Sequence, residues 1–353
     1  MRKLKVCVIG AGSISDMHFG PYSKLENVDL AGVYDLSVER AGEKAKKYNI
    51  PKVYQSLEEV LADTSIEAVS ICTWNNSHAD IAIKAMEADK HVLVEKPLCM
   101  TMEEALKVEE TAKRTNKILQ VGFVRRFATN TNVLKSFIDK GRLGDIYYAK
   151  TTCIRRLGNP GGWFSDKSRS GGGPLIDIGV HVIDICWYLM GKPKVKSIVG
   201  HTYHLLGNRN NIENLSFYKA ADYDANNNTV EDMANALITF ENGASLSVDV
   251  SFTLHAKKDE LSVKLYGTKG GAELEPALHI VSEENNTILN IEPQVDHLSF
   301  DFEKAFLGEV QGFVDSCLNG AEVIAPVEDG VEIMKILTGI YEAAEKKCEV
   351  VFE

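Results

Sequence analysis

Short apolar runs alternate with amphipathic stretches along the first third of the chain. A continuous apolar run of this length is typical of a parallel strand covered on both faces, and an amphipathic stretch is typical of a helix. The expected strands are 4–9, 30–34, 52–54, 68–73, 92–94 and 118–123, with helices between them. This alternation predicts a doubly wound parallel sheet. It stops near Phe123, so we expect a first domain over residues 1–123.

The rest of the chain, residues 124–353, has a different pattern. Helices are expected to about residue 140 and over 175–189, 300–318 and 330–347, and strands over 146–154, 195–203, 233–240, 244–252, 261–266 and 271–274. From Lys194 the apolar residues recur with period two, which favours a largely antiparallel sheet with one covered face. The Asn-rich connection 205–229 is long enough to suggest a border of a substrate site or a subunit contact. We therefore expect a second α/β domain over 124–353.

Composition excludes several classes of protein. The net charge is −11, from 50 acidic and 39 basic residues, which gives no support for a nucleic-acid or anionic-membrane partner. No segment approaches the roughly 20 apolar residues that a membrane span needs. The seven cysteines are scattered and never form CxxC, which favours a reducing cytoplasm without disulfides or a zinc site.

A glycine-rich turn follows the first expected strand. Residues 10–15 read Gly-Ala-Gly-Ser-Ile-Ser between a strand and a helix, the context in which G-x-G-x-x-G binds a dinucleotide. Gly10 permits the tight turn, and Gly12 lets the backbone approach a pyrophosphate at the helix N-terminus. Gly10, Gly12, Ser13 and Ile14 are the predicted contacts. The alternative is a glycine-rich turn without a ligand.

Asp35 ends the second strand, about where an acid is expected to bind the adenosine ribose hydroxyls. A carboxylate there repels a 2′-phosphate, so Asp35 favours NAD over NADP. Arg40, one turn into the next helix, could soften that preference and leave NADP possible. The alternatives are an N-cap-like role for Asp35 and a solvated position for Arg40.

Polar residues also follow the fourth strand, near the expected path of the nicotinamide half of the cofactor. The predicted contacts are Thr73, Trp74, Asn75 and, in the first turn of the next helix, His78.

The fifth strand ends abruptly in Glu95, Lys96 and Pro97. Ligands of open α/β sheets bind just beyond the carboxyl ends of the strands, so Lys96 is expected at the mouth of such a crevice, and Glu95 and Lys96 are predicted cofactor contacts. The alternative is a surface turn with a solvated Glu-Lys pair.

The helix expected over 175–189 is apolar nearly all round, yet Asp177, His181 and Asp184 are spaced i, i+4 and i+7 on one face. A buried carboxylate without a partner costs several kcal/mol. The stripe therefore lines a polar cavity, binds a metal or forms a closed internal network. No further carboxylate or histidine lies close in sequence, so we expect no metal.

The whole set resembles the Gfo/Idh/MocA family, the relatives of inositol dehydrogenase and glucose–fructose oxidoreductase. The matching residues are Gly10-Ala11-Gly12, Asp35, Glu95-Lys96-Pro97, Gly122-Phe123 with Arg126, and Asp177 with His181. The resemblance implies a Rossmann domain followed by an α/β domain built on a large open sheet, through which a homodimer or homotetramer forms. It also implies hydride transfer between NAD(P) and a sugar, cyclitol or related polyol. Trp74, where the family often has Pro, and Ser15 depart from its pattern.

By that resemblance, Lys96 and His181 handle the hydroxyl proton, and Asp177 orients the substrate or holds the His–Lys network. The plausible substrate contacts beside them are Arg126, Trp163 and Asp166.

The chemistry of the reaction supports the same residues. Hydride leaves carbon only as a base takes the hydroxyl proton, and a lysine beside a cationic nicotinamide or a histidine can serve near neutral pH. We expect the amine of the first domain and the imidazole–carboxylate pair of the second to converge on the nicotinamide. The alternatives are an NADPH-preferring sugar reductase, an NAD-assisted glycosidase and a non-catalytic dinucleotide-binding regulator.

Overall fold

The computed structural model describes residues 2–224 and 226–352 and forms two compact units. The first unit is the chain up to Phe127 together with Phe302–Met334. The second is Ala128–Asp301 together with the chain from Lys335 onward. No helix within the described ranges combines the length and the apolar character that a bilayer crossing needs.

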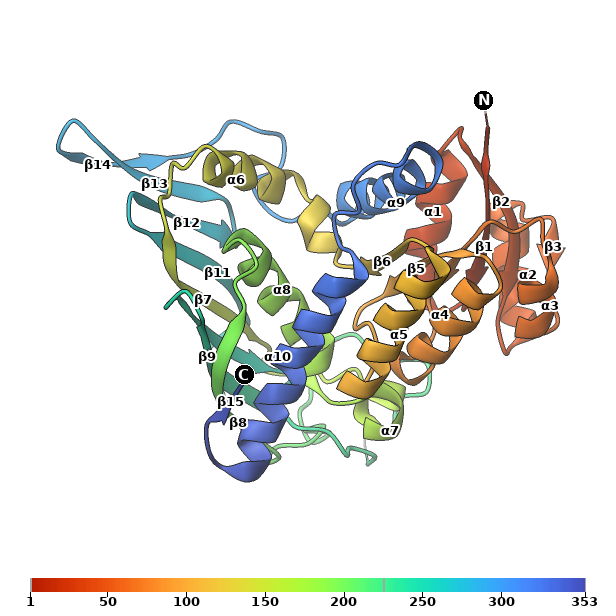
Figure 1. The fold of residues 1–353 in the computed structure, drawn as a ribbon. Coiled ribbons are helices and arrows are strands. Elements are labelled where there is room, and N and C mark those ends of the chain that lie inside the picture. The colour runs from red at the N-terminus through yellow and green to blue at the C-terminus, as the bar shows by residue number, and fades with distance from the viewer. Residues whose placement is uncertain (1, 225, 353) are drawn as a thin grey trace. The chain divides into compact units, whose positions relative to one another are not determined.

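The first unit contains a six-stranded parallel sheet in the order β3-β2-β1-β4-β5-β6 (Figure 1). Its strands are β1 (Leu4–Ile9), β2 (Val28–Tyr34), β3 (Lys52–Val53), β4 (Ala68–Ile71), β5 (His91–Glu95) and β6 (Leu119–Gly122). The helices between them are α1 (Asp16–Lys24), α2 (Val38–Tyr48), α3 (Leu57–Ala62), α4 (His78–Glu87) and α5 (Met102–Thr115). The predicted doubly wound sheet is confirmed. The strand order reverses between β1 and β4, where ligands of such sheets bind.

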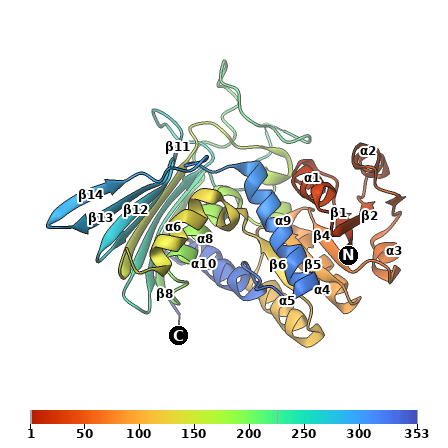
Figure 2. The same cartoon turned by 90° about the horizontal axis from the view of Figure 1, so that it is seen from above.

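A helix from near the end of the chain completes the core of this unit. Helix α9 (Phe302–Asn319) packs against α1 and β1, and its Phe313 joins Phe19 of α1 and Ala41 of α2 in one buried cluster (Figure 2). Beyond α9, the Val121 N–H donates to the Ala325 carbonyl at 2.9 Å. The sequence pattern had assigned everything after residue 123 to the second domain. The structure instead groups Phe302–Met334 with the first unit, because its apolar side chains fill that core.

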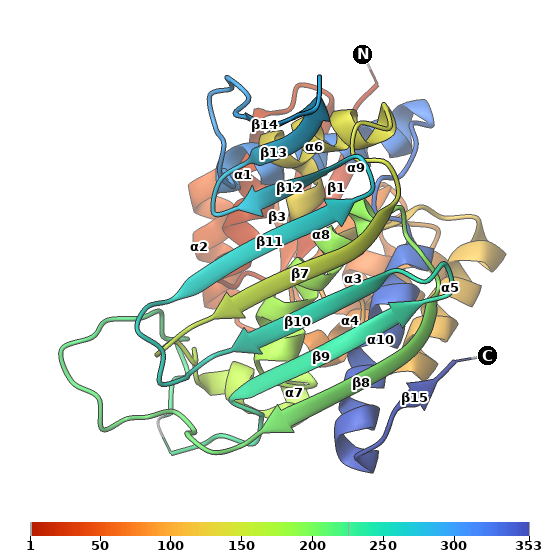
Figure 3. The same ribbon diagram turned by 90° about the vertical axis from the view of Figure 1, so that its left-hand side faces the viewer.

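The second unit is built on a nine-stranded sheet in the order β14-β13-β12-β11-β7-β10-β9-β8-β15 (Figure 3). Its strands are β7 (Ile146–Ile154), β8 (Val195–Tyr203), β9 (Met233–Phe240), β10 (Ser245–Ser251), β11 (Glu260–Gly267), β12 (Gly270–Glu275), β13 (His279–Glu284), β14 (Thr287–Ile291) and β15 (Val350–Val351). Only the β7–β10 pairing of this sheet is parallel among the described residues, so the prediction of a mostly antiparallel sheet is confirmed. The helices are α6 (Thr129–Asp139), α7 (Lys167–Ser170), α8 (Val180–Leu189) and, from Lys335 onward, α10 (Val327–Lys346).

Strand register gives this sheet one covered and one open face. Ile198, Ile238, Leu246, Ala149 and Leu265 are register partners across five strands, and each is fully buried. Helix α8 packs against β7, β10 and β11 on this side, and α6 packs against β12. The residues one position along each strand point the other way, to the face turned toward the viewer in Figure 3.

Candidate active site

The glycine turn lies at the switch point of the first sheet. Gly10 has φ +99°, and a Cβ added there would lie 2.5 Å from the Cys72 carbonyl oxygen beyond β4, so only glycine fits. Gly12 has an ordinary φ of −71°, and apart from its two chain neighbours no residue of the described chain has an atom within 4 Å of a Cβ added there. Ser13 and Ile14 are exposed beside this open side of the turn. The buried Ser15 hydroxyl donates to the Gly12 carbonyl at 2.6 Å, which explains a serine where the motif usually has glycine or alanine.

The carboxylate of Asp35 ties the end of β2 to this turn. One oxygen accepts from the Ala11 N–H at 2.7 Å, and the other accepts from the Ser37 N–H at 2.7 Å and from the Arg40 guanidinium at 2.9 Å. Arg40 is about half exposed. The acid therefore lies against the glycine turn, next to an exposed guanidinium.

The loop after β4 is held by His78. This buried imidazole has Nδ1 2.8 Å from the Pro97 carbonyl oxygen and Nε2 3.1 Å from the Thr73 carbonyl oxygen. Burial lowers the pKa of His78 and outweighs the two carbonyls, which act in the opposite direction. The imidazole thus joins the ends of β4 and β5. Trp74 is exposed in the same loop, and Asn75 is buried.

Glu95 and Lys96 have different surroundings. Glu95 is only 5% exposed, which excludes a solvated Glu-Lys pair, whereas Lys96 is partly exposed and precedes Pro97 through a cis peptide bond. One oxygen of Glu95 accepts from the Lys96 N–H at 3.2 Å, and the other lies 2.8 Å from Nε2 of His18. The side chain of Glu95 is thus held by internal partners, and its contact with a cofactor stays a prediction.

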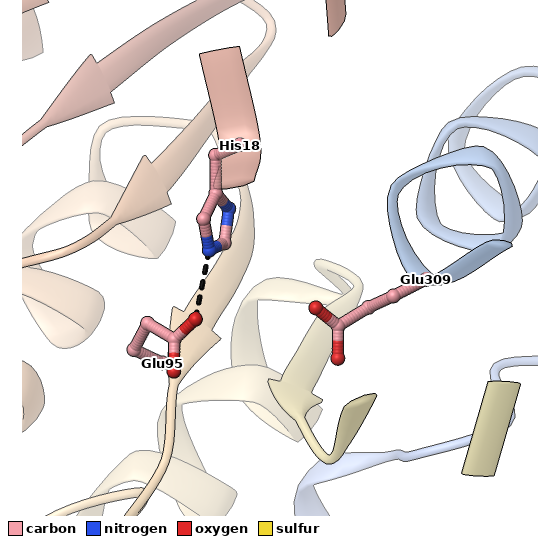
Figure 4. A group of neighbouring side chains, drawn as sticks. All are labelled: His18, Glu95 and Glu309. Carbon is pink, nitrogen blue, oxygen red and sulfur yellow. Dashed lines mark hydrogen bonds and ion pairs between the residues drawn. The ribbon is translucent and has the colours of Figure 1, made fainter. Parts of the chain in front are cut away.

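Two residues that the sequence pattern did not single out complete this cluster: His18 of α1 and Glu309 of α9. Both are fully buried, and ligand atoms of His18, Glu95 and Glu309 all lie within 4.8 Å of one another (Figure 4). The available signal was a histidine beside Phe19 on the buried side of an expected helix. Glu309 gave no comparable signal, because Glu95 and His18 lie far away from it in the sequence. His, Glu and Glu are also the ligand types that could hold a divalent cation.

In the second unit, Asp177 and His181 lie partly exposed on consecutive segments. Asp177 belongs to a π-helical turn, Leu175–Gly179, and His181 to the first turn of α8. The sequence predicted one regular helix with Asp177, His181 and Asp184 on a single stripe. The prediction of a single stripe is wrong at the start of the segment, because a π turn holds more residues than an α-helical turn. Asp184, unlike Asp177 and His181, is buried. Such turns are frequent at functional sites.

Glu231, also not anticipated, anchors the start of this segment. Its buried carboxylate accepts from the Gly173 N–H at 2.9 Å, the Leu175 N–H at 3.2 Å and the Tyr341 hydroxyl at 2.8 Å. Burial raises the pKa of Glu231, and the three hydrogen bonds only partly offset it.

The structure places the three further predicted substrate contacts in different surroundings. Arg126 is buried in the first unit, where it forms an ion pair with Asp329 and donates to the Ile324 carbonyl at 2.8 Å. This guanidinium is thus held by partners within the first unit. In the second unit, Asp166 caps α7 by accepting from the Ser168 N–H at 3.0 Å, and Trp163 is partly exposed.

The Asn-rich connection borders a cavity of about 410 Å³ in the second unit. Its lining includes four basic residues, Arg156, Arg209, His255 and Lys257. None of the predicted site residues lines it, so the cavity is separate from the candidate active site.

Comparison with known proteins adds to this geometry. A family model described as "Oxidoreductase family, NAD-binding Rossmann fold" matches residues 4–123, and one described as "Oxidoreductase family, C-terminal alpha/beta domain" matches residues 135–351. D-glucoside 3-dehydrogenase of Escherichia coli K12 is 34% identical over 98% of this chain and 97% of its own. Myo-inositol 2-dehydrogenase of Thermotoga maritima is 26% identical over 98% and 96%. The structure of levoglucosan dehydrogenase in complex with NADH and L-sorbose matches the fold with a TM-score of 0.86 at 24% identity, covering both chains completely.

Proposed function

The chain belongs to the Gfo/Idh/MocA oxidoreductase family, and we propose that it oxidises a secondary alcohol of a sugar, cyclitol or related polyol with NAD. Its first unit is the family's NAD-binding Rossmann domain. Relatives along nearly its whole length are named as dehydrogenases of glucosides and inositols, which supports this substrate class. The observation that carries the proposal is the partly exposed Lys96 beyond β5, in the same sheet as the glycine turn.

The turn and the acid beside it fit the cofactor. The unobstructed side of Gly12 gives a pyrophosphate close access to the backbone, and Asp35 offers a carboxylate to ribose hydroxyls. That carboxylate also disfavours a 2′-phosphate, which supports NAD over NADP. When bound, the nicotinamide supplies the hydride acceptor.

The proton chemistry is assigned to Lys96, His181 and Asp177. A base must lie within hydrogen-bond reach of the substrate hydroxyl, so that the O–H proton leaves as the C–H hydride is transferred and the carbonyl forms. A neutral amine at Lys96 can take that proton, and the imidazole of His181 can take or relay it. Asp177, on the neighbouring turn, would orient His181 or a second substrate hydroxyl. The proposal requires these groups to meet in the working enzyme.

The test is a screen for NAD reduction at 340 nm over inositols, methyl glucosides, levoglucosan and sugar acids. Lys96→Met is expected to lower kcat by about 100-fold or more, the usual size of a general-base contribution. The Kd for NAD should stay within about threefold. Lys84→Met, on the exposed surface of α4, is the control. Near-normal turnover of Lys96→Met with NAD bound would refute the role of Lys96.

The same screen separates the alternatives. A reductase would prefer NADPH in a direct comparison of cofactor affinities. A glycosidase would release 4-nitrophenol from 4-nitrophenyl glucosides without net NADH, and a regulator would bind NAD tightly with no absorbance change on any compound.

We further infer that a second copy of the chain packs on the open face of the nine-stranded sheet. Apolar side chains are exposed on that face, including Val199, Leu237 and Tyr266. A location in the reducing cytoplasm stays a prediction from the scattered cysteines.

A further inference from the structure

A continuous line of polar contacts runs through the interior of the first unit behind Lys96. The Tyr22 hydroxyl lies 3.3 Å from the Ser70 hydroxyl, which lies 2.9 Å from Nδ1 of His18. Nε2 of His18 lies 2.8 Å from one carboxylate oxygen of Glu95, whose other oxygen accepts from the Lys96 N–H. The line therefore connects α1 and β4 to the backbone of the proposed base.

Helix α9 adds a second carboxylate to this line. In Figure 4, the side chain of Glu309 extends from α9 toward His18 and Glu95. The ring of Phe306, one turn earlier on α9, meets the His18 ring edge-on with centroids 6.0 Å apart. The Gln120 side-chain amide of β6 donates to the Glu309 carbonyl at 3.1 Å. This hydrogen bond goes to the backbone carbonyl and holds α9 in place at Glu309, while the side chain faces His18 and Glu95.

The cluster of His18, Glu95 and Glu309 carries charges that make it sensitive to substitution of any one of the three residues. Two carboxylates close together in the interior are strongly unfavourable unless protons or positive charge offset them, so replacing one of the three side chains alters the surroundings of the other two. Burial acts to raise the pKa of Glu95, but the hydrogen bond and charge of His18, together with the charges of Lys96 and His78, lower it overall. The titratable side chains facing the cluster besides these are Cys72 and Tyr22.

We propose that His18 and Glu309 are positioning residues for Lys96, acting through the buried carboxylate of Glu95. This inference rests on the proposed role of Lys96. Because Glu95 is the last residue of β5 and holds the Lys96 N–H, any change in its carboxylate moves the start of the Lys96–Pro97 segment. A displacement of about 1 Å at a reacting group can cost about 100-fold in rate.

The test uses His18→Gln and Glu309→Gln, which keep side-chain volume and hydrogen-bonding capacity so that the protein folds. Ser56→Ala, which removes the N-cap of α3 and so perturbs the same unit elsewhere, is the control. The first measurement needs no substrate: Lys96 is acetylated competitively with trace acetic anhydride and compared with Lys84 by mass spectrometry. Both glutamine variants should change the relative rate at Lys96 by at least threefold, and Ser56→Ala should leave it unchanged.

The second measurement uses the substrate found in the 340 nm screen. Both variants should lower kcat at least tenfold while KM and the Kd for NAD stay within about threefold, a split that a general loss of stability does not produce. Unchanged Lys96 acetylation in both variants would overturn the proposal, as would stoichiometric metal in the purified protein, which would make the cluster a cation site. If Lys96→Met retains turnover, the proposed function fails, but the acetylation rates still decide whether the cluster positions Lys96.

Discussion

Asp35 is the residue whose chemistry bears most directly on cofactor choice. Its carboxylate serves the Ala11 N–H, the Ser37 N–H and Arg40, and an amide in its place would offer only one acceptor oxygen. Asp35→Asn removes the negative charge that disfavours a 2′-phosphate. We expect KM for NAD to rise about tenfold, in line with about 1.5–3 kcal/mol for a charged hydrogen bond, and the NADP-to-NAD ratio of kcat/KM to rise as well.

The control for this change is Asp80→Asn, the same substitution at an exposed position of α4. It should leave both cofactors unaffected. An Asp35→Asn enzyme with an unchanged NADP-to-NAD ratio would show that Asp35 does not select the cofactor.

Residues with a local signature were predictable, and residues defined by distant partners were not. Gly10 and Lys96 each sit at the end of an apolar run, so their place at the sheet edge could be inferred from sequence. His18, Glu309 and Glu231 have partners on elements far along the chain, and no spacing rule connects them. The ion pair of Arg126 could not be inferred for the same reason, since Asp329 lies 203 positions away.

The glycine turn offers a matched pair of substitutions in one element. In Gly12→Ala the new Cβ meets open space at an ordinary φ, so the free energy of unfolding should change by less than about 0.5 kcal/mol. The same methyl group would stand where the pyrophosphate must approach, so the Kd for NAD should rise at least about tenfold. Gly10→Ala instead forces a positive φ and a clash with the Cys72 carbonyl.

Gly10→Ala is therefore expected to lower the free energy of unfolding by about 2 kcal/mol or more. Urea unfolding and NAD titration of both variants separate the two effects. Equal NAD affinity in Gly12→Ala and the native protein would mean that the cofactor does not approach this turn.

The segment that carries Asp177 and His181 depends on Glu231 in a way that pH should reveal. Burial raises the pKa of Glu231 above its usual 4.5, so the folded state binds the proton more tightly than the unfolded state does. Its contribution to stability is therefore fully present below about pH 4.5 and is lost as the pH rises through the folded-state pKa. The Glu231→Gln variant has no titrating group at this position. Its side-chain NH2 also faces a backbone or hydroxyl donor, which lowers the free energy of unfolding by about 1–3 kcal/mol.

The native protein's advantage over Glu231→Gln in urea unfolding should thus shrink between pH 5 and pH 8. Glu345→Gln, on the exposed end of α10, should show a constant difference from the native protein. An advantage that grows with pH would contradict the assigned direction of the shift.

Element boundaries followed hydrophobic periodicity wherever that periodicity was strong. Strands β7 and β8 begin and end as the pattern predicts. Strands β13 and β14 were missed because they lie at the sheet edge, where exposed residues such as Ile288 and Glu283 break the alternation. The π turn before α8 was missed because one extra residue in a turn leaves no mark on a nearly all-apolar helix.

Taking the chain as a whole, the division into units could not be read from the order of the sequence. The pattern change near Phe123 marks the end of the βα alternation. At that point in the chain, the apolar side chains of α1 and α2 in the first core are not yet covered by a further helix. Helix α9 supplies it after the whole second sheet has been made. A pattern analysis that moves along the chain assigns such a returning helix to the domain it follows.

The open face of the nine-stranded sheet leads to a prediction about assembly. Leu237 of β9 is 46% exposed on this face, with Val199 as its register partner, and Tyr148 stacks on Tyr266 with ring centroids 5.6 Å apart. Large apolar side chains exposed on one face favour an interface with another copy of the chain. Leu237→Arg would bury an unpaired charge between two copies, so the assembly should fall to the chain mass of 39.0 kDa in light scattering at micromolar concentration. Leu106→Arg, at an exposed position of α5, should keep the native mass. If the native protein is already monomeric at micromolar concentration, this face does not pair with a second copy.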